Sequence, residues 1–219
     1  MPHPSSATPS AWPLFDLVVR TPRLTLRPAR DEDLAALVEL VRAGVRDPEQ
    51  PVFLFDWDLK PEPALAREFL QFHWGLRANW SAASWGMEMA VLDQDGVPIG
   101  MQGIYGRDFA ARRTVLTGSW LGRAHQGRGY GTEMRAGALA LAFDGLGAIA
   151  AESGHLDGNH ASRRVSEKLG YQPNGMETVA PRGEPMPERR VRLERAAWNP
   201  PVPVVIEGLE ACRDLFGAA

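Results

Sequence analysis

The sequence predicts an α+β fold, a mixed α/β domain in which helices flank a central sheet. Two β-prone runs, 85–92 and 97–105, flank the polar turn 93–96, which is typical of a hairpin. A third β-prone run, 114–121, leads through a glycine-rich loop into a helix of Ala, Leu and Met. After Asp31, apolar residues recur at helical spacing, at Leu34, Leu37, Val38, Val41 and Val45. Strands and helices therefore share one domain.

Length and composition indicate one globular domain with appendages. A chain of 219 residues is long enough to bury a full core. Its net charge of −3 argues against a nucleic-acid binder that depends on a basic surface. Its single cysteine, Cys212, excludes an intramolecular disulfide and a multi-cysteine zinc site. Because no apolar run approaches the ~20 residues of a membrane span and no signal peptide is evident, we expect a cytoplasmic protein with no membrane partner.

The chain divides into a disordered N-terminus (1–10), a main domain (11–198) and a C-terminal strand–helix extension (199–219). Exposed apolar edges at the two termini suit mutual pairing or a homodimer. In the main domain we expect, in order, a strand at 24–27, a helix from 31 to about 47, an apolar-rich loop at 50–61, a second helix to about 80, the hairpin, the strand 114–121, a helix at 130–143, a strand at 148–153, a helix at 159–169, a long mobile loop at 175–187 and a closing strand at 189–195.

The glycine-rich loop 126–132 has the properties of an anion-binding site. Its glycines, at positions 127, 129 and 131, allow positive φ angles and a close approach of the backbone to a ligand. Successive amides in such a loop form a concave nest, and the first amides of the following helix add partial positive charge. Arg128 supplies a full charge. We therefore expect a phosphate or diphosphate here.

Two common nucleotide motifs do not fit this loop. A Walker loop needs Lys and then Ser or Thr after its last glycine, but Gly127 is followed by Arg128 and Gly129. A dinucleotide fingerprint needs G-x-G-x-x-G near an N-terminal strand, whereas here the spacing is G-x-G-x-G and more than a hundred residues precede it. The pattern Gln126-x-x-Gly129-x-Gly131 instead resembles the diphosphate loop of GNAT acyl-CoA-dependent N-acyltransferases.

Two further segments resemble the RimJ/RimL-like branch of that superfamily. One is Thr21-Pro-Arg-Leu-Thr-Leu-Arg27, and the other is Asp157-Gly-Asn-His-Ala-Ser162 with Val165-x-Glu-Lys-Leu-Gly-Tyr171. The three motifs cover roughly residues 20–195. The lead-in 12–17 and the tail are most similar to an actinobacterial subgroup that includes users of succinyl-CoA. The resemblance implies the GNAT fold, a twisted and mostly antiparallel sheet that splays between two neighbouring strands.

The resemblance also implies an acyl-CoA co-substrate, acetyl-CoA or succinyl-CoA, whose acyl group passes to a primary amine by direct attack in a ternary complex. The diphosphate is bound and not cleaved, so no metal is expected. Pantetheine would pair with the splayed strand end, where an amide also polarises the thioester oxygen. The residues expected to bind the cofactor are Trp120, Leu121, Gln126, Gly127, Arg128, Gly129, Tyr130, Gly131, Thr132 and Asn159.

Catalysis needs a proton donor for the thiolate and a base for the amine. Ser162 falls where RimL-like enzymes are proposed to protonate the leaving thiolate, although Asn159 and Ser162 also suit a helix N-terminus. As the base we rank Glu152 first, before Glu88 and Glu177. Each of the three carboxylates has an alternative role in an ordinary surface ion pair. The spacing of His125, His155 and His160 has no tetrahedral zinc signature.

The acyl group and the acceptor stay open at this point. A succinyl carboxylate would need a cation such as Arg107, Arg112, Arg113 or Arg182, each of which is also an ordinary surface residue. The apolar loop 50–61 is either folded onto the core or a wall of the acceptor site. Two alternatives to a small-molecule enzyme remain, namely a protein N-terminal or lysine acyltransferase of ribosomal-protein type, and a non-catalytic acyl-CoA-binding module.

Overall fold

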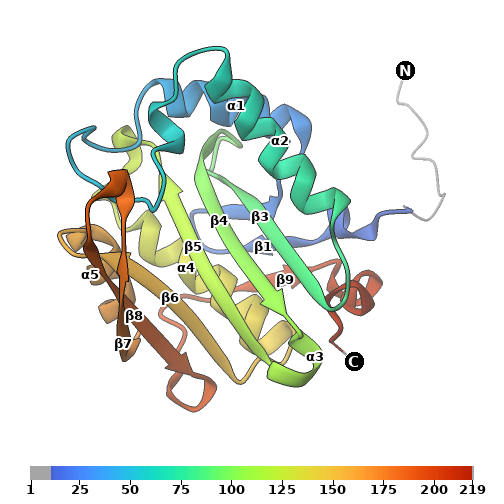
Figure 1. Cartoon of the computed structure of the whole chain (residues 1–219). Helices are drawn as coiled ribbons and strands as arrows, with labels where there is room; N and C mark the ends of the chain where they lie inside the picture. Colours follow the sequence, from blue (N-terminus) through green and yellow to red (C-terminus); the bar gives the residue numbers. More distant parts are fainter. Residues whose placement is uncertain (1–10, 219) are drawn as a thin grey trace, which may run out of the picture.

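The protein forms one nine-stranded sheet with helices on both faces (Figure 1). The computed structural model describes residues 11–218, so the predicted disordered segment 1–10 lies outside the described residues. The strands are β1 (Val18–Arg20), β2 (Thr25–Pro28), β3 (Ser84–Leu92), β4 (Pro98–Arg107), β5 (Thr114–Leu121), β6 (Ala150–Leu156), β7 (Gln172–Val179), β8 (Met186–Glu194) and β9 (Val205–Glu207). The helices are α1 (Asp31–Arg42), α2 (Ala64–Ala78), α3 (Phe109–Arg112), α4 (Tyr130–Ala140) and α5 (His160–Lys168).

The strand order is β7-β8-β6-β5-β4-β3-β2-β1-β9, and every neighbouring pair except one is antiparallel. The exception is β5 with β6, which run parallel and pair only where Thr114–Leu116 meets Ala150–Glu152. Beyond Leu116 the two strands separate. This confirms the expected mixed α/β fold with a mostly antiparallel sheet that splays between two neighbouring strands.

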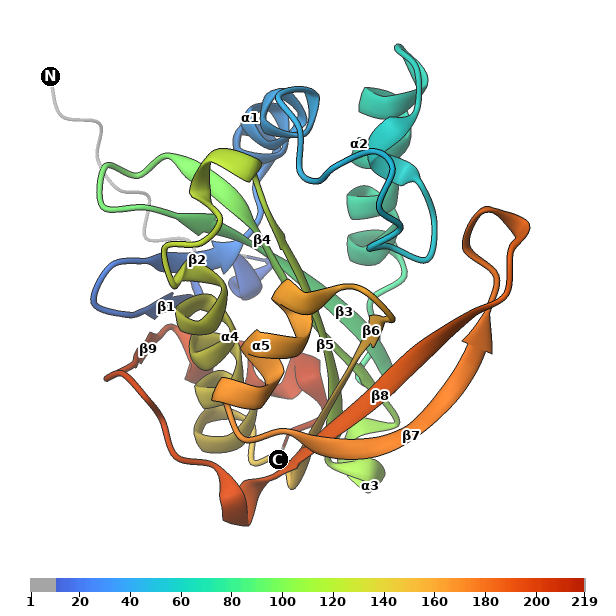
Figure 2. The same ribbon diagram turned by 90° about the vertical axis from the view of Figure 1, so that its left-hand side faces the viewer.

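The two faces of the sheet carry different layers. Helices α1 and α2 cover one face over a core that includes Leu37, Phe69 and Met101. Helices α4 and α5 lie on the opposite face, and the β7–β8 hairpin curls away from the sheet toward the side of α2 (Figure 2). Helix α4 is buried from Glu133 to Ala140, and its small Ala and Gly side chains allow it to lie close against the strands.

The C-terminal tail belongs to the sheet and the core. Strand β9 pairs with β1, so the two ends of the chain pair with each other, as the sequence indicated. The predicted tail helix is instead two 3₁₀ turns, Leu209–Ala211 and Arg213–Phe216. Phe216 is fully buried, and its carbonyl accepts a hydrogen bond of 3.0 Å from the indole of Trp85. The tail therefore stabilises the end of β3.

The prediction of a mobile loop at 175–187 is wrong for the first part of that range, because β7 occupies Gln172–Val179. Pro173 and Gly175 disfavour a strand interior, and they are tolerated here because β7 is an edge strand. The pairing register with β8 shifts between Pro173 and Met176, as in a bulge. Residues 172–178 are all exposed, so no period-2 apolar pattern marked them as a strand.

The Thr21-Pro-Arg motif fixes the start of α4. Glu133, in the first turn of α4, is buried and accepts three hydrogen bonds, from the Thr21 hydroxyl (2.8 Å), the Arg23 amide (2.8 Å) and Arg23 Nε (2.6 Å). Arg23 Nη1 also donates to the carbonyl of Arg128 at 3.1 Å. Two motifs that are more than a hundred residues apart in the sequence thus hold the glycine loop together.

We expect Glu133→Ala to lower the free energy of unfolding by about 2 kcal/mol, because three donors lose their acceptor while half-exposed Arg23 can turn to water. Chemical denaturation measures the loss. Glu167→Ala is the matched control, since Glu167 forms only an exposed ion pair with Arg163 on α5, and its loss should be below about 0.5 kcal/mol. Equal effects of the two substitutions would contradict a role of Glu133 in the fold.

Candidate active site

The glycine loop forms a nest of amides at the start of α4. Gly127 and Gly129 have φ angles of +75° and +83°, and Gly129 is the N-cap of α4. Within residues 11–218, the main-chain amides of residues 127–131 donate to no protein acceptor. They are the free donors of a turn followed by a helix N-terminus. The predicted anion site therefore has the backbone geometry that it needs.

Gln126 braces this loop through its side chain. Its amide nitrogen donates to the carbonyl of Val45, just after α1, at 2.7 Å and to that of Leu121, at the end of β5, at 2.8 Å. Of the other predicted loop residues, Arg128 is exposed, and Tyr130 lies under the Arg23 guanidinium at 4.6 Å. In this structure Gln126 positions the loop, and the amides after it face outward.

Side chains fill the base of the gap between β5 and β6. The hydroxyl of Ser153 donates to the carbonyl of Thr117 at 2.9 Å, and the Thr117 hydroxyl donates to the carbonyl of Glu152 at 3.1 Å. Because alternate residues of a strand present the same edge, the main chain of Ser119 and Leu121 faces the same gap as that of Thr117. Beyond these two bridges no strand pairs with this edge of β5, although the Leu121 carbonyl accepts from Gln126. The side chain of Trp120 points to the face of the sheet that α1 and α2 cover, where it packs against Trp57 and Phe69.

A buried arginine lies behind this gap. Arg135 of α4 is 3% exposed and donates to Gln102 Oε1 (3.3 Å), Ser153 Oγ (3.1 Å) and Ser119 Oγ (2.8 Å). In the described part of the chain its guanidinium contacts no carboxylate. Neutral acceptors therefore hold it in place between β4, β5 and β6.

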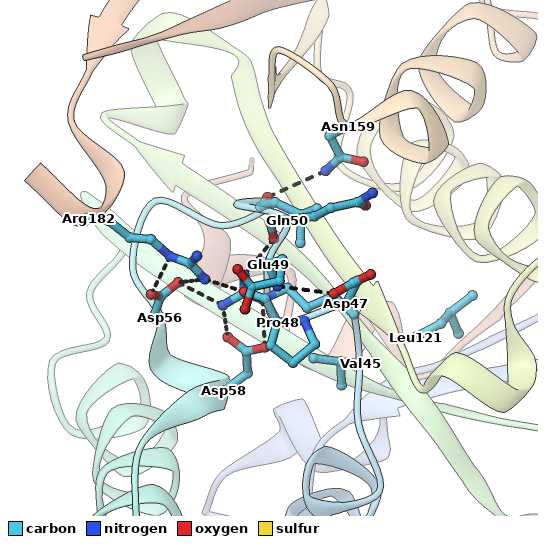
Figure 3. A network of polar contacts seen from close by, with 12 residues as sticks. Val45, Asp47, Pro48, Glu49, Gln50, Asp56, Asp58, Leu121, Asn159 and Arg182 are labelled. Carbon is cyan, nitrogen blue, oxygen red and sulfur yellow. Dashed lines mark hydrogen bonds and ion pairs between the residues drawn. The ribbon is translucent and has the colours of Figure 1, made fainter. Parts of the chain in front are cut away.

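The loop 44–60 crosses the mouth of the gap and is held from three sides (Figure 3). Arg46 is buried and contacts both carboxylate oxygens of Asp58, at 2.7 and 2.8 Å, and Asp56 Oδ1 at 2.7 Å. Arg182, at the tip of the β7–β8 hairpin, donates to Asp56 at 2.7 Å and to the carbonyl of Pro48 at 2.6 Å. Asn159 Nδ2 lies 3.4 Å from the carbonyl of Val52. The loop thus joins α1, the hairpin and α5.

Aromatic side chains of this loop pack onto the core. Trp57 lies with its ring centre 5.6 Å from that of Trp120 and 5.9 Å from that of Phe69, and Phe53 packs beside it. Phe55 is 78% exposed. The loop is therefore folded onto the core through some of its apolar groups, while it leaves others at the surface.

A cleft of about 940 Å³ lies between α2 and the β7–β8 hairpin. Figure 2 shows these two elements facing each other above the sheet. The floor of the cleft is formed by β3 to β6, through residues such as Trp85, Tyr105 and Leu116, and the walls carry Phe72 of α2 and Asn174 of β7. A cleft of this size accommodates an acceptor the size of a short peptide.

The buried end of the Tyr105 ring meets a carboxylic acid. The hydroxyl of Tyr105 donates to Glu88, and burial raises the pKa of Glu88 to about 7, with the hydrogen bond from Tyr105 partly offsetting the rise. Burial and the Glu88 carboxylate also raise the pKa of Tyr105. Glu88 further lines a cavity of about 20 Å³ together with His73, whose pKa burial lowers to about 3. No arginine or lysine in the described chain forms an ion pair with Glu88.

Two glycines separate Glu88 from the gap. In the sheet register Glu88 pairs with Gly103, and Gly103 pairs with Gly118 of β5, so the three residues form a row across one face. A Cβ on Gly103 would lie 2.5 Å from Glu88 Oε1, whereas a Cβ on Gly118 would meet no atom within 4 Å. The Tyr105 hydroxyl also lies over Gly103, 2.9 Å from an added Cβ, so the Glu88–Tyr105 pair occupies the face above Gly103 and the space above Gly118 is open.

Comparison with known proteins identifies the family. The model of the acetyltransferase (GNAT) domain matches residues 23–172, well over half of the chain. The chain belongs to the GNAT acetyltransferase family. It is therefore an acyl-CoA-dependent N-acyltransferase by family, as the three motifs indicated.

Solved structures of GNAT proteins share the fold. A putative ribosomal-protein-serine acetyltransferase from Vibrio cholerae is 22% identical, covering 81% of this chain and 97% of its own, with a TM-score of 0.63. RimJ of Mycobacterium smegmatis, solved with a CoA disulfide, is 18% identical, covering 91% and 94%, with a TM-score of 0.67. RimL, a ribosomal alpha-N-protein acetyltransferase solved with coenzyme A, is 14% identical, covering 81% and 97%, with a TM-score of 0.65.

The residues predicted for GNAT catalysis lie around the gap with different partners. Asn159 is the N-cap of α5, and its Oδ1 accepts from the Ser162 amide at 3.1 Å, so the capping role is observed. Glu152 lines the cleft but forms an ion pair with Arg192 at 2.8 Å. Glu177 is exposed and forms an ion pair with Arg190 at 2.8 Å. The catalytic roles of Ser162 and Glu152 stay predictions.

Sequence reasoning missed Tyr105 and ranked Glu152 ahead of Glu88. The available signal was the glycine spacing in β4, at positions 100, 103 and 106, because glycine inside a strand marks a close approach of another group. Only the register shows that Gly103 faces Glu88. Among the described residues, no group of three or more His, Cys, Asp or Glu side chains is placed to hold a metal ion. None of the helices in 11–218 has the length and apolar character needed to cross a membrane.

Gly129→Ala should weaken coenzyme A binding about tenfold in calorimetry, because a left-handed alanine is strained by about 1–2 kcal/mol and would turn the amide nest. Gly96→Ala is the matched control. Gly96 has a φ angle of +78° in the β3–β4 turn, with no atom within 4 Å of an added Cβ. The control should lose comparable stability and keep the affinity of the parent. Equal affinity in both variants would argue against the nest.

Glu88→Gln should change the pH dependence of stability. The pKa of Glu88 is about 7 in the folded protein against an ordinary 4.5, so the folded state holds this proton more tightly. Stability from Glu88 is therefore full below pH 4.5 and falls as the pH rises to 7, by on the order of 3 kcal/mol. The variant lacks this fall, so its stability relative to the parent should rise between pH 4.5 and pH 8. Denaturation at both pH values measures it, and a constant difference would contradict the raised pKa.

Proposed function

We propose that the protein transfers an acetyl group from acetyl-CoA to the primary amine of an acceptor molecule that binds in the cleft, by direct attack in a ternary complex. The observation that carries the proposal is the row Glu88–Gly103–Gly118, which joins a carboxyl group without an ion-pair partner in the described chain to the open edge of β5. Donor and acceptor have separate entrances, one at the glycine loop and one at the cleft between α2 and the hairpin.

The donor is held by backbone groups. Amides of residues 127–131, with the first turn of α4, face outward to take the diphosphate, and Arg128 adds charge. The pantetheine arm lies along the edge of β5 at Ser119 and Leu121, beside the predicted contacts Trp120 and Asn159. An amide on this edge polarises the thioester oxygen. This assignment rests on the opening of the sheet after Leu116.

In this proposal Glu88 is the base, in place of Glu152, which the sequence analysis ranked first. As a carboxylate it takes a proton from the acceptor ammonium, directly or through Tyr105. The amine nitrogen then forms the C–N bond to the thioester carbon, the C–S bond breaks, and Ser162 protonates the thiolate. The proton that the nitrogen loses on becoming an amide returns to Ser162 through solvent, so the hydroxyl is restored. Of the three candidate carboxylates, Glu88 is the one without an arginine partner in the described chain, and its pKa of about 7 matches base catalysis near neutral pH.

The acceptor that suits Glu88 best is an α-amino group. Its ordinary pKa of ~7.8 lies within about one unit of that of Glu88, so proton transfer costs about 1 kcal/mol. A lysine ammonium at ~10.4 would cost about 4.6 kcal/mol. This comparison favours the amino terminus of a peptide or protein. It agrees with the ribosomal-protein acetyltransferases among the structural neighbours, which are similar in fold.

A thiol-release assay with acetyl-CoA and amino-terminal peptides tests the proposal. We expect turnover with the parent chain and a loss of 10²–10⁴-fold in kcat with Glu88→Gln, because general base catalysis contributes about that factor. The rise of activity through pH 7 should vanish in the variant. Tyr105→Phe should shift that rise to higher pH, since the Tyr105 hydrogen bond lowers the pKa of Glu88.

Two outcomes would redirect the proposal. Coenzyme A binding by calorimetry without thiol release for any amine would instead support the non-catalytic module. Unchanged kcat and pH profile in Glu88→Gln, together with a loss in Glu152→Gln, would return the base to Glu152. The Glu152→Gln variant is the matched control because Glu152 also lines the cleft.

The choice between acetyl and succinyl donors is tested in the same assay. Of the four candidate arginines, Arg113 lies over Phe109 at 5.7 Å and Arg182 is held by Asp56, while Arg107 and Arg112 line the acceptor cleft. This arrangement favours acetyl-CoA, and a higher kcat/KM with succinyl-CoA would overturn it. The homodimer and the cytoplasmic location stay predictions, and light scattering after size-exclusion chromatography checks the first.

A further inference from the structure

The acceptor cleft has an unequal distribution of charge. Four charged residues line it, namely Arg107, Arg112, Glu152 and Arg190. Glu152 is neutralised by Arg192, and Arg190 contacts Glu177 and Glu188 at 2.8 and 3.3 Å. Arg107 and Arg112 have no carboxylate partner within residues 11–218. The lining of the cleft therefore carries two positive charges that form no ion pair with any group of the described residues.

Arg107 and Arg112 extend from the two ends of one short turn. Arg107 ends β4 and Arg112 ends α3, and the residues on either side of α3, Asp108 and Arg113, both adopt left-handed backbone angles. The Asp108 amide donates to the carbonyl of Ala83 at 2.6 Å, and the Arg113 carbonyl accepts from Ile149 at 2.7 Å. Phe109 between them is fully buried. The turn therefore anchors the backbone of both residues at the cleft, while their exposed side chains can adjust to a ligand.

The two arginines lie on the acceptor side of the reaction centre. Arg107 is four residues along β4 from Gly103, where Glu88 and Tyr105 meet, and four residues of strand span about 13 Å. An acyl group of four carbons attached to the thioester does not reach that far. An acceptor that is bound along the cleft with its amine at Glu88 does reach it.

We infer that Arg107 and Arg112 form a subsite for a carboxylate of the acceptor, at the end of the cleft away from the amine that is acylated. A planar guanidinium binds a carboxylate through two parallel hydrogen bonds, so two such groups on one turn select this anion. An extended peptide with its amino terminus at Glu88 carries an acidic side chain at its third residue roughly 10 Å away, and the length of an arginine side chain covers the rest of the ~13 Å to the backbone of Arg107. This inference rests on the proposed acyl transfer, and it specifies the substrate class of that site.

The test compares matched acceptors with the full-length chain and acetyl-CoA. One pair of peptides differs only in Glu or Gln at the third residue. A second pair is 6-aminohexanoate and its amide, which place a carboxylate or a neutral group at a similar distance without a peptide backbone. We expect kcat/KM about 10–100-fold higher for the acidic peptide than for its amide partner, mainly through KM, and a smaller ratio at high salt.

The variants Arg107→Gln and Arg112→Gln should each lower this ratio, and the double variant should bring it to about one. Arg67→Gln is the matched control, because Arg67 is an exposed arginine of α2 without an ion pair and outside the cleft lining. It should keep the full ratio. Circular dichroism confirms the fold of each variant.

The outcomes separate the inference from the proposed function. Thiol release with equal kcat/KM for the Glu and Gln peptides, and for both aminohexanoate compounds, would overturn the carboxylate subsite and leave the acyltransferase activity standing. Selectivity for aminohexanoate alone would support the subsite with a small-molecule source of the carboxylate. Selectivity that persists in the double variant would assign it to other residues and overturn the inference. Absence of thiol release with every amine would remove the proposed function itself.

Discussion

The early separation of β5 from β6 is the constraint on which the rest of the site depends. Parallel strands pair to their ends unless something takes the place of the missing hydrogen bonds, because an unpaired buried amide or carbonyl is costly. Here Thr117 and Ser153 exchange side-chain hydrogen bonds with the facing main chain, just after the last backbone pair. The sheet thus opens without orphaned groups at its base, and the free edge of β5 becomes available to a ligand.

Arg135 makes the opening rigid. A buried cation costs several kcal/mol unless its donors are satisfied. Its Nε, Nη1 and Nη2 atoms each contact a neutral acceptor, on β4, β6 and β5 respectively. The side chain therefore ties α4 to three strands at the point where they diverge. Because the glycine loop directly precedes α4, and Glu133 in the same helix holds Arg23, one helix connects the loop to the open strand edge.

The carboxylates of the site differ in whether they have an arginine partner. Arginines compensate Glu152 and Glu177 on the cleft and hairpin side, whereas Glu88 is held by a tyrosine hydroxyl and apolar surroundings. A carboxylate beside an arginine is a weak base, and a buried one without a cation is a stronger base. Among the described residues Arg107 and Arg112 have no carboxylate partner, so they are the uncompensated charges of the cleft lining. Proton transfer and recognition of the acceptor are therefore assigned to different ends of one groove.

Local features were readable from the sequence because they depend on neighbouring residues. The glycines at 127 and 129 take positive φ angles as their spacing predicted, and the β3–β4 hairpin and the caps of α5 follow from local turn chemistry. The family and its mixed α/β fold followed from three such motifs. Strand β7 escaped prediction because Pro173 and Gly175 are tolerated only at an edge, and the position of a strand in a sheet is not a local property.

The sequence by itself determined the family of the chain and the glycine loop in which we predict a diphosphate site, since a loop of consecutive amides is built from adjacent residues. Only the tertiary structure decided which carboxylates have an arginine partner. The pKa of Glu88 depends on burial and on the hydrogen bond from Tyr105, seventeen positions away, while Glu152 forms an ion pair with Arg192, forty positions away. Electrostatic environment is a sum over groups that meet only after folding, so the spacing of residues along the chain does not contain it.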